Sequence, residues 1–346
     1  MKRTFTIIFI SICLFMISGA PTITFRVLFS APVDITHDIQ SLAIIDRSVP
    51  SDDLRSILEG VLTGELPGQD KLATQYAIDG VSDIMLNSSR FKVIRTTEML
   101  EGSKSGSTFP DPLEWGLING LCRKYDVDAI LSLETFDSDY IVTNASKQVE
   151  EKDKDGKIVK RTVFTAEGVA TVSIGFRIYE PGNRNIEDQF HVSHNMRWDA
   201  SGNSITNAVE LLINKDGALK EVSYNAGNRY ARRLTPMWYS VSRKYYRKSK
   251  KDMDLAEGAR MMEVNDWDNA IIALERAVEN GHRKTRGKAA HNLAVVYEIL
   301  GDLDQAKSWA SNAWGKYNNK GSRDYGYDLT RRMNDQRRLD NQLDRE

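Results

Sequence analysis

Basic and aromatic side chains are concentrated between Arg229 and Lys251, a stretch without Asp or Glu. Cations interleaved with aromatic rings can bind nucleic acid, anionic lipid headgroups or anionic polymers. For an exported chain we expect a lipid headgroup or a cell-wall polymer, and no nucleic acid. The predicted anionic-surface residues are Arg232, Arg233, Arg243, Lys244, Arg247 and Lys248. In the alternative interpretation, the stretch is an interdomain helix whose cations pair with acidic neighbours and whose aromatic rings lie in the core.

Three acids near the end of a predicted strand, Glu134, Asp137 and Asp139, are further candidates for chemistry. General acid and base catalysis needs two positioned carboxylates in a cleft, as in a hydrolase that cuts an envelope polymer. The sequence contains no nucleophile elbow, phosphate loop or dinucleotide fingerprint. We therefore predict no catalytic residue and a protein that is not an enzyme.

The sequence offers few groups of metal ligands. Residues 151–156 imitate the start of a calcium loop, but Thr162 stands where a bidentate Glu is needed, so a charged hairpin loop is predicted. His191 and His194 lie three apart on a predicted strand and face opposite sides. Cys122, on a predicted amphipathic helix, is expected to be a buried and inert thiol. No metal and no cofactor is predicted.

The first thirty residues have the composition of an export signal. Two basic residues precede an apolar run that ends in Ser18-Gly19-Ala20, a pattern after which signal peptidases cut. Pro21 disfavours cleavage there, and the uncharged span Thr4–Phe25 is long enough for a retained membrane anchor. Lipidation of Cys13 is the third alternative, although the residue before it is too large for a lipid-attachment motif. We predict an exported protein, periplasmic or anchored in the cell envelope, with residues 1–30 as signal peptide or anchor.

The chain from residue 31 to residue 250 alternates between strand and helix patterns. This order predicts an α+β fold in which helices pack on a mixed sheet, within one α/β envelope domain. The formal net charge of −1 predicts no global attraction to nucleic acid or lipid. Strand patterns cover residues 41–46, 90–95, 128–136, 157–179 and 187–198. Helical spacing covers residues 51–65, 69–86, a segment after Pro112, and 204–234.

Residues 251–346 contain an internal repeat. Gly258 and Ala270 recur as Ala294 and Ala306, and both differences, 294 minus 258 and 306 minus 270, are 36. The tetratricopeptide period is about 34 residues, so two extra residues in the turn 280–286 account for the difference. We predict an all-α, tetratricopeptide-like module supported by the first domain, with a charged tail that is a capping helix or a frayed end. Its packing positions are Gly258, Trp267, Ala270, Ala277, Ala294, Tyr297, Gly301, Ala306 and Ala313.

Short phrases of the sequence resemble a known family. SLAIIDRS, RFKVIRT, YDVDAILSLETFDSDY and WYSVSRKYY, together with the repeats, resemble an uncharacterised, Bacteroidetes-type family of bacterial envelope lipoproteins with a C-terminal tetratricopeptide-like region. The resemblance spans residues 31–314. More loosely, the N-terminal part is similar to the α/β domains of envelope proteins such as the curli-secretion lipoprotein. The family implies an envelope location and no known activity, and the chain departs from it in the lipid-attachment motif around Cys13.

These observations predict a non-enzymatic exported envelope protein. We expect it to bind a protein partner through its helical repeats and to be held at a membrane by its N-terminus. The first alternative is an assembly subunit of the envelope that oligomerises through the α/β domain. The second is a hydrolase that acts on a cell-envelope polymer.

Overall fold

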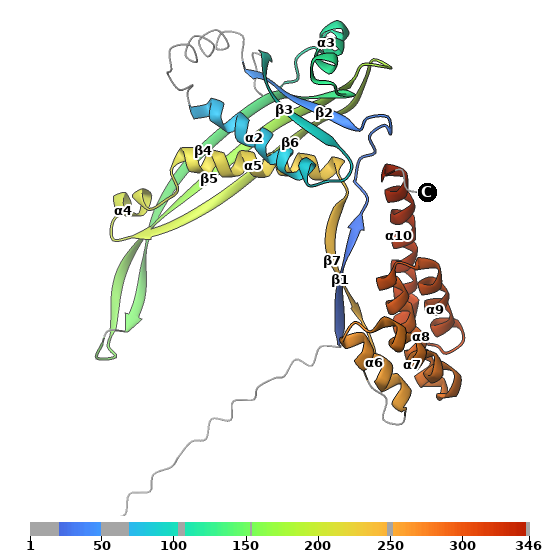
Figure 1. The fold of residues 1–346 in the computed structure, drawn as a ribbon. Coiled ribbons are helices and arrows are strands. Elements are labelled where there is room, and N and C mark those ends of the chain that lie inside the picture. The colour runs from blue at the N-terminus through green and yellow to red at the C-terminus, as the bar shows by residue number, and fades with distance from the viewer. Residues whose placement is uncertain (1–20, 50–68, 103–107, 153, 248–251, 344–346) are drawn as a thin grey trace, which may run out of the picture. The chain divides into compact units, whose positions relative to one another are not determined.

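The computed structural model of the protein describes residues 21–49, 69–102, 108–152, 154–247 and 252–343 (Figure 1). It has a mixed β-sheet with packed helices followed by a run of helices, which confirms the predicted α+β fold class. The predicted export segment up to residue 20, the predicted helix 51–65 and Lys248 lie outside the described residues.

The chain divides into two compact units. The helical unit consists of residues up to Val27 and Trp238–Asp335, and the sheet unit consists of Leu28–Met237 and the residues from Gln336 onward. The division falls inside the last helix, α10 (Lys320–Leu343). This helix shows that the charged tail continues as a helix to Leu343.

The sheet unit is built on five strands in the order β3-β2-β4-β5-β6. Strand β2 pairs in parallel with both β3 and β4, whereas β4 pairs antiparallel with β5 and β5 with β6, so the sheet is mixed. The strands are β2 (Ser41–Val49), β3 (Lys92–Glu101), β4 (Ala129–Lys152), β5 (Ile158–Glu180) and β6 (Asn185–Gly202).

Helices cover both faces of this sheet (Figure 1). Apolar side chains of α2 (Gln69–Leu86) and α5 (Lys215–Leu234) form the larger core with alternate residues of β2, β4, β5 and β6. The opposite face packs against α3 (Trp115–Tyr125), where Cys122 is buried as predicted. Successive side chains of a strand point to opposite faces, so the same strands contribute to both cores.

Two predicted helices differ in the structure. The predicted helix 204–234 is interrupted, and α4 (Ile205–Glu210) and α5 each begin at a polar N-cap, Ser204 and Asn214. These side chains accept a backbone N–H and so favour a new helix start over continuation. The predicted interdomain helix is wrong from Met237, because Met237–Lys244 is strand β7, which pairs with β1 (Thr22–Phe29) in a two-stranded sheet. The end of the predicted N-terminal segment therefore overlaps a strand.

The helical unit contains two similar helix pairs. They are α6 (Met253–Glu263) with α7 (Trp267–Asn280), and α8 (Arg283–Leu300) with α9 (Leu303–Gly315). The turns match at the offset of 36: Asn265 and Gly301 both have positive φ, and Asp266 and Asp302 both cap the helix that follows. At this offset α8 begins earlier than α6, because Arg283 precedes residue 289, the position equivalent to Met253.

The repeated N-cap gives a stability prediction. Asp302 accepts the backbone N–H of Gln305 at 2.9 Å. Replacing Asp302 by Ala is expected to lower the free energy of unfolding by about 1 kcal/mol, because a helical N–H loses its acceptor. Chemical denaturation followed by circular dichroism would measure the change. Asp302→Asn is the control, since Asn caps as well as Asp and should leave stability nearly unchanged.

Candidate functional site

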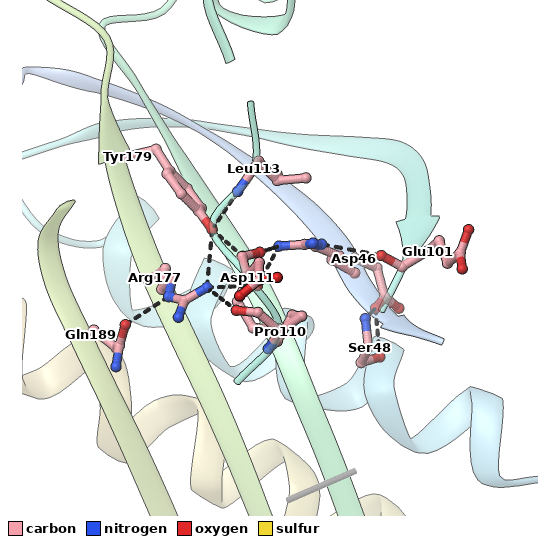
Figure 2. Close-up of polar contacts among 11 residues, drawn as sticks. Asp46, Ser48, Glu101, Pro110, Asp111, Leu113, Arg177, Tyr179 and Gln189 are labelled. Carbon is pink, nitrogen blue, oxygen red and sulfur yellow. Dashed lines mark hydrogen bonds and ion pairs between the residues drawn. The ribbon is translucent and has the colours of Figure 1, made fainter. Parts of the chain in front are cut away.

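A buried polar network lies on the α3 side of the sheet, across β2, β4 and β5 (Figure 2). Its centre is the Glu134 carboxylate, whose side chain has no exposed area. One carboxylate oxygen accepts from Arg47 at 2.9 Å and faces Arg177 at 3.5 Å. The other accepts the Tyr179 hydroxyl at 2.9 Å. Arg47 lies on β2, Glu134 on β4, and Arg177 and Tyr179 on β5. The pairing of these three strands therefore brings the four side chains together.

The two arginines also fix the segment before α3. Arg177 donates to the Pro110 carbonyl at 2.7 Å, and Arg47 donates to the Asp111 carbonyl at 2.8 Å. The Phe109 ring lies over the Arg177 guanidinium, 4.7 Å from ring centroid to Cζ. Burial, and then the charge of Glu134, raise the pKa of Tyr179, so its hydroxyl stays protonated and can donate.

This network gives Glu134 the environment of a structural carboxylate. Its oxygens contact the Arg47 and Arg177 guanidinium groups and the Tyr179 hydroxyl, and none of its side-chain surface is exposed. Asp137 and Asp139, the other two predicted acids, lie on the exposed part of β4. The structure therefore buries one of the three acids and exposes the other two. Among the described residues, no group of three or more His, Cys, Asp or Glu is placed to hold a metal ion.

The second site is an extended chain segment, Arg243–Arg247, which is held by helices within the helical unit. Asn292 of α8 bonds both backbone groups of Tyr246: its amide oxygen accepts the N–H at 2.8 Å, and its amide nitrogen donates to the carbonyl at 2.8 Å. His291 Nε2 lies 3.0 Å from the Lys244 carbonyl oxygen. Bonds of this kind recognise a peptide backbone irrespective of its side chains.

Side chains of the segment are held by acidic residues. The Glu298 carboxylate is fully buried on α8. It accepts hydrogen bonds from Nε and Nη2 of Arg243, both at 2.7 Å, and from the Tyr325 hydroxyl at 2.5 Å. Burial and the Glu298 charge raise the pKa of Tyr325 well above its usual value, so this hydroxyl stays a donor. The Glu263 carboxylate of α6 accepts a hydrogen bond from the Tyr245 hydroxyl at 2.7 Å. The Arg243 Cζ also lies 5.6 Å from the ring centroid of Tyr325 on α10, so α6, α8 and α10 all contact the segment.

His291 makes the helical unit sensitive to pH. Its ring is buried between Ser322 and the Lys244 carbonyl, and burial lowers its pKa. The unfolded chain protonates this histidine near pH 6.5, whereas the folded chain does so only at lower pH. The free energy of unfolding is therefore expected to fall below about pH 6.5, by at most about 1.4 kcal/mol per pH unit, until the folded pKa is reached.

Denaturation at several pH values between about 7.5 and 5.5 measures this dependence. His291→Gln removes the contribution of this ring, whereas His191 and His194 keep theirs in both proteins. Equal pH slopes in the two proteins would show that His291 is not held neutral.

The structure places the predicted anionic-surface residues on both units. Arg233 is bound by Asp188, with N–O distances of 3.2 and 3.3 Å, and lies 3.4 Å from the centroid of Phe190. Arg243 and Arg247 pair with Glu298 and Glu263. Three of the predicted cations are thus paired with carboxylates, as the alternative interpretation expects. The remaining members are Arg232 and Lys244, whose side chains are exposed, and Lys248, which lies outside the described residues.

The predicted packing positions of the repeat all belong to the helical unit. A Cβ on Gly258 would come within 2.6 Å of Leu274 Cγ, so this position requires a close helix approach. Gly301 ends α8 with φ of 87°. Trp267 and Tyr297 are partly buried against the core. The alanines are fully buried: Ala270, Ala277, Ala294, Ala306 and Ala313.

Residues 39–246 match the family described as Domain of unknown function (DUF8603). This match covers more than half of the chain. The chain belongs to the DUF8603 family. Residues 256–340 match a second family, described as Domain of unknown function (DUF6340). The DUF8603 span contains the Glu134 network, and the DUF6340 span contains α7, α8 and α9.

Other comparisons add little. No curated protein matches the chain. One similar solved structure is described as a neuraminyllactose-binding hemagglutinin homologue from Helicobacter pylori, with 9% identity and a TM-score of 0.19 over 57% of this chain and 82% of that chain. A likeness at this level does not bear on fold or function. No helix in the described part of the chain is long and apolar enough to cross a bilayer.

Sequence reasoning missed most of both sites. Arg47, Arg177, Tyr179 and His291 are not among the residues predicted from the sequence. The repeat does indicate that α8 makes polar contacts that α6 does not make. At the offset of 36, the apolar Leu255 and Met262 of α6 are replaced by His291 and Glu298. Polar residues at positions that are apolar in the other repeat indicate a contact that only one repeat makes.

Proposed function

We propose that this DUF8603 protein is a non-enzymatic, exported envelope protein that is tethered through its N-terminal segment and binds a protein partner through its helical unit. The observation that carries the proposal is the Arg243–Arg247 segment. Helices α6 and α8 hold this extended chain through hydrogen bonds to its backbone and its side chains, and the Tyr325 ring of α10 lies against Arg243. The same helices therefore have the chemistry needed to bind extended peptide. The signal-like N-terminus and the resemblance to envelope lipoproteins support the location.

Exposed apolar side chains suggest where the partner binds. Val264 and Leu300 occupy equivalent positions of the two repeats, just before the turn of each helix pair, and are 69% and 48% exposed. Ile272 of α7 and Trp314 of α9 are also exposed. A partner that covers these apolar groups removes apolar surface from water, which favours binding there.

Affinity capture from envelope extracts tests the proposal. The full chain is expected to retain at least one specific protein, and the double variant Val264→Asp/Leu300→Asp or the double variant Ile272→Asp/Trp314→Asp is expected to lose it. These positions are exposed, so the fold should tolerate the changes. The matched control is Ile158→Asp/Val159→Asp, which alters two exposed apolar residues of the sheet unit. Equal capture by all variants would contradict partner binding by the helical unit.

Fractionation of the native host tests the location. We expect the protein in the envelope fraction, and the intact mass of the purified protein shows whether the N-terminus is cleaved, retained or acylated. Recovery of the uncut chain entirely in the cytosol would contradict the proposal of export. This result would leave the partner measurement unaffected, so the two parts can fail separately.

A further inference from the structure

Strand β4 has a long edge that pairs with nothing in the described part of the chain. Its pairing with β2 ends at Leu133, whereas its pairing with β5 continues to Lys152 (Figure 1). From Thr135 onward, one row of N–H and C=O groups therefore faces away from the sheet. Edges of this kind are templates for pairing with another strand, and proteins usually shorten or cover them.

The exposed edge is apolar at its middle. Ile141 and Val142 are 55% and 39% exposed, and the two residues that follow them, Thr143 and Asn144, are uncharged and exposed. Charged residues lie on either side: Asp137 and Asp139 toward the sheet, and Lys147 toward the tip of the hairpin. Alternate residues share a face, so these three charges and Ile141 lie on one face of the strand.

We propose that β4 pairs antiparallel with β4 of a second copy of this chain, about a two-fold axis at Thr143. In this register Asp139 stands opposite Lys147 of the other copy, twice by symmetry, and Ile141 stands opposite Ala145. Asp137 is a diagonal neighbour of the same lysine. Opposite charges at directly facing positions stabilise antiparallel pairs, and the same patch on both copies closes the assembly at two.

The charges also disfavour a neighbouring register. Moving the axis to Asn144 would place Asp137 opposite Glu151 and leave Lys147 opposite Ile141. Like charges at facing positions are destabilising, so the sequence favours the axis at Thr143 over the axis at Asn144. An axis at Val142 would instead place Asp137 opposite Lys147 and Asp139 opposite Ala145, and the exchange of Asp139 with Lys147 distinguishes this register from the proposed one. A lysine on a strand edge ordinarily opposes pairing, but here it has a carboxylate partner. This inference is independent of the proposed partner binding, because it concerns only the sheet unit.

Disulfide trapping tests the axis. In the full chain, Thr143→Cys places two thiols on facing positions, where Cβ atoms lie about 4.5–5.5 Å apart, close to disulfide geometry. We expect a covalent dimer under mild oxidation. Thr165→Cys is the matched control, because Thr165 is partly exposed on the neighbouring β5 and pairs with Ala145 of β4 and Ser201 of β6, so it does not lie at an edge. The native Cys122 is buried. Equal cross-linking of the two variants would overturn the assigned axis.

Charge exchange tests the register. Analytical ultracentrifugation of the full chain over a concentration series is expected to show a monomer–dimer equilibrium. Lys147→Glu places Glu opposite Asp139 twice and should weaken the dimer about tenfold or more. Asp139→Lys should do the same, and the double variant Asp139→Lys/Lys147→Glu should restore dimerisation. Restoration shows that the pairing of the two charges, and not either side chain alone, determines dimerisation.

Lys160→Glu is the charge-matched control on β5, and we expect it to leave the dimer unchanged. A chain that stays monomeric at every concentration would overturn the proposal. A dimer that is insensitive to both single variants, or that the double variant fails to restore, would also overturn it.

Discussion

Replacing Glu134 by Gln is expected to lower the free energy of unfolding of the sheet unit by about 3–5 kcal/mol. The substitution keeps the shape of the side chain but removes the negative charge that two buried arginines share. Arg47 and Arg177 are only 11% and 6% exposed at their side chains, so water cannot replace the lost partner. An unpaired buried cation costs far more than the net value of the pair that it had formed.

The matched control lies on the same strand. Glu151 is 61% exposed, and its pair with Arg161 spans 3.8 Å at the surface. Glu151→Gln should change stability by no more than about 0.5 kcal/mol, because exposed ion pairs contribute little. Chemical denaturation of the two variants and the parent chain measures the difference. A loss below about 1 kcal/mol for Glu134→Gln would show that the arginines find another partner or water.

The Glu134 network could not be read from the sequence because its members are far apart along the chain. Arg47 lies on β2, Glu134 on β4, and Tyr179 on β5. Their proximity depends on the pairing of β2 with β4 and of β4 with β5, and on the register shift between Leu133 and Thr135. No spacing along the chain signals such a cluster. Sequence reasoning did single out Glu134, but as a possible acid and not as the partner of two arginines.

Elements with a clear hydrophobic period could be predicted well. Strands β5 and β6 follow their predicted alternation, β2 contains the predicted apolar run, and α2 has the predicted bounds Gln69–Leu86. Elements without this signal were missed. The β4 strand continues past residue 136 through polar residues because β5 offers it a pairing partner, which composition does not show.

The two strands of the helical unit were missed for a different reason. Residues of β1 are uncharged up to Phe25, so they looked like the continuation of an export segment. Residues of β7 belong to the basic stretch, whose charge pattern favoured a helix. Their strand conformation depends on each other, since β1 and β7 pair across more than two hundred residues, as the 218-residue separation of Thr24 and Ser242 illustrates. Long-range pairing of this kind leaves no local signal.

Replacing Gly227 by Ala is expected to destabilise the sheet unit by about 3 kcal/mol, although Ala is the better helix former. Gly227 lies within α5 at its crossing with α2, and a Cβ there would overlap the carbonyl oxygen of Ala77. Gly80 of α2 meets the backbone of Tyr224 in the same way. Since the obstacle is backbone and not a flexible side chain, the helices would have to separate and lose apolar contact with each other.

Gly120→Ala is the matched control, because Gly120 lies within α3, is exposed, and would place its Cβ more than 4 Å from any other group. This variant should be stabilised by about 0.5–1 kcal/mol, the ordinary gain of Ala over Gly in a helix. The two substitutions are chemically identical, so opposite signs in the measured free energy of unfolding would isolate the close approach of α2 and α5 as the cause. If Gly227→Ala were stabilising too, the two helices could not cross at the distance described, and the core between them and the sheet would have to be packed more loosely.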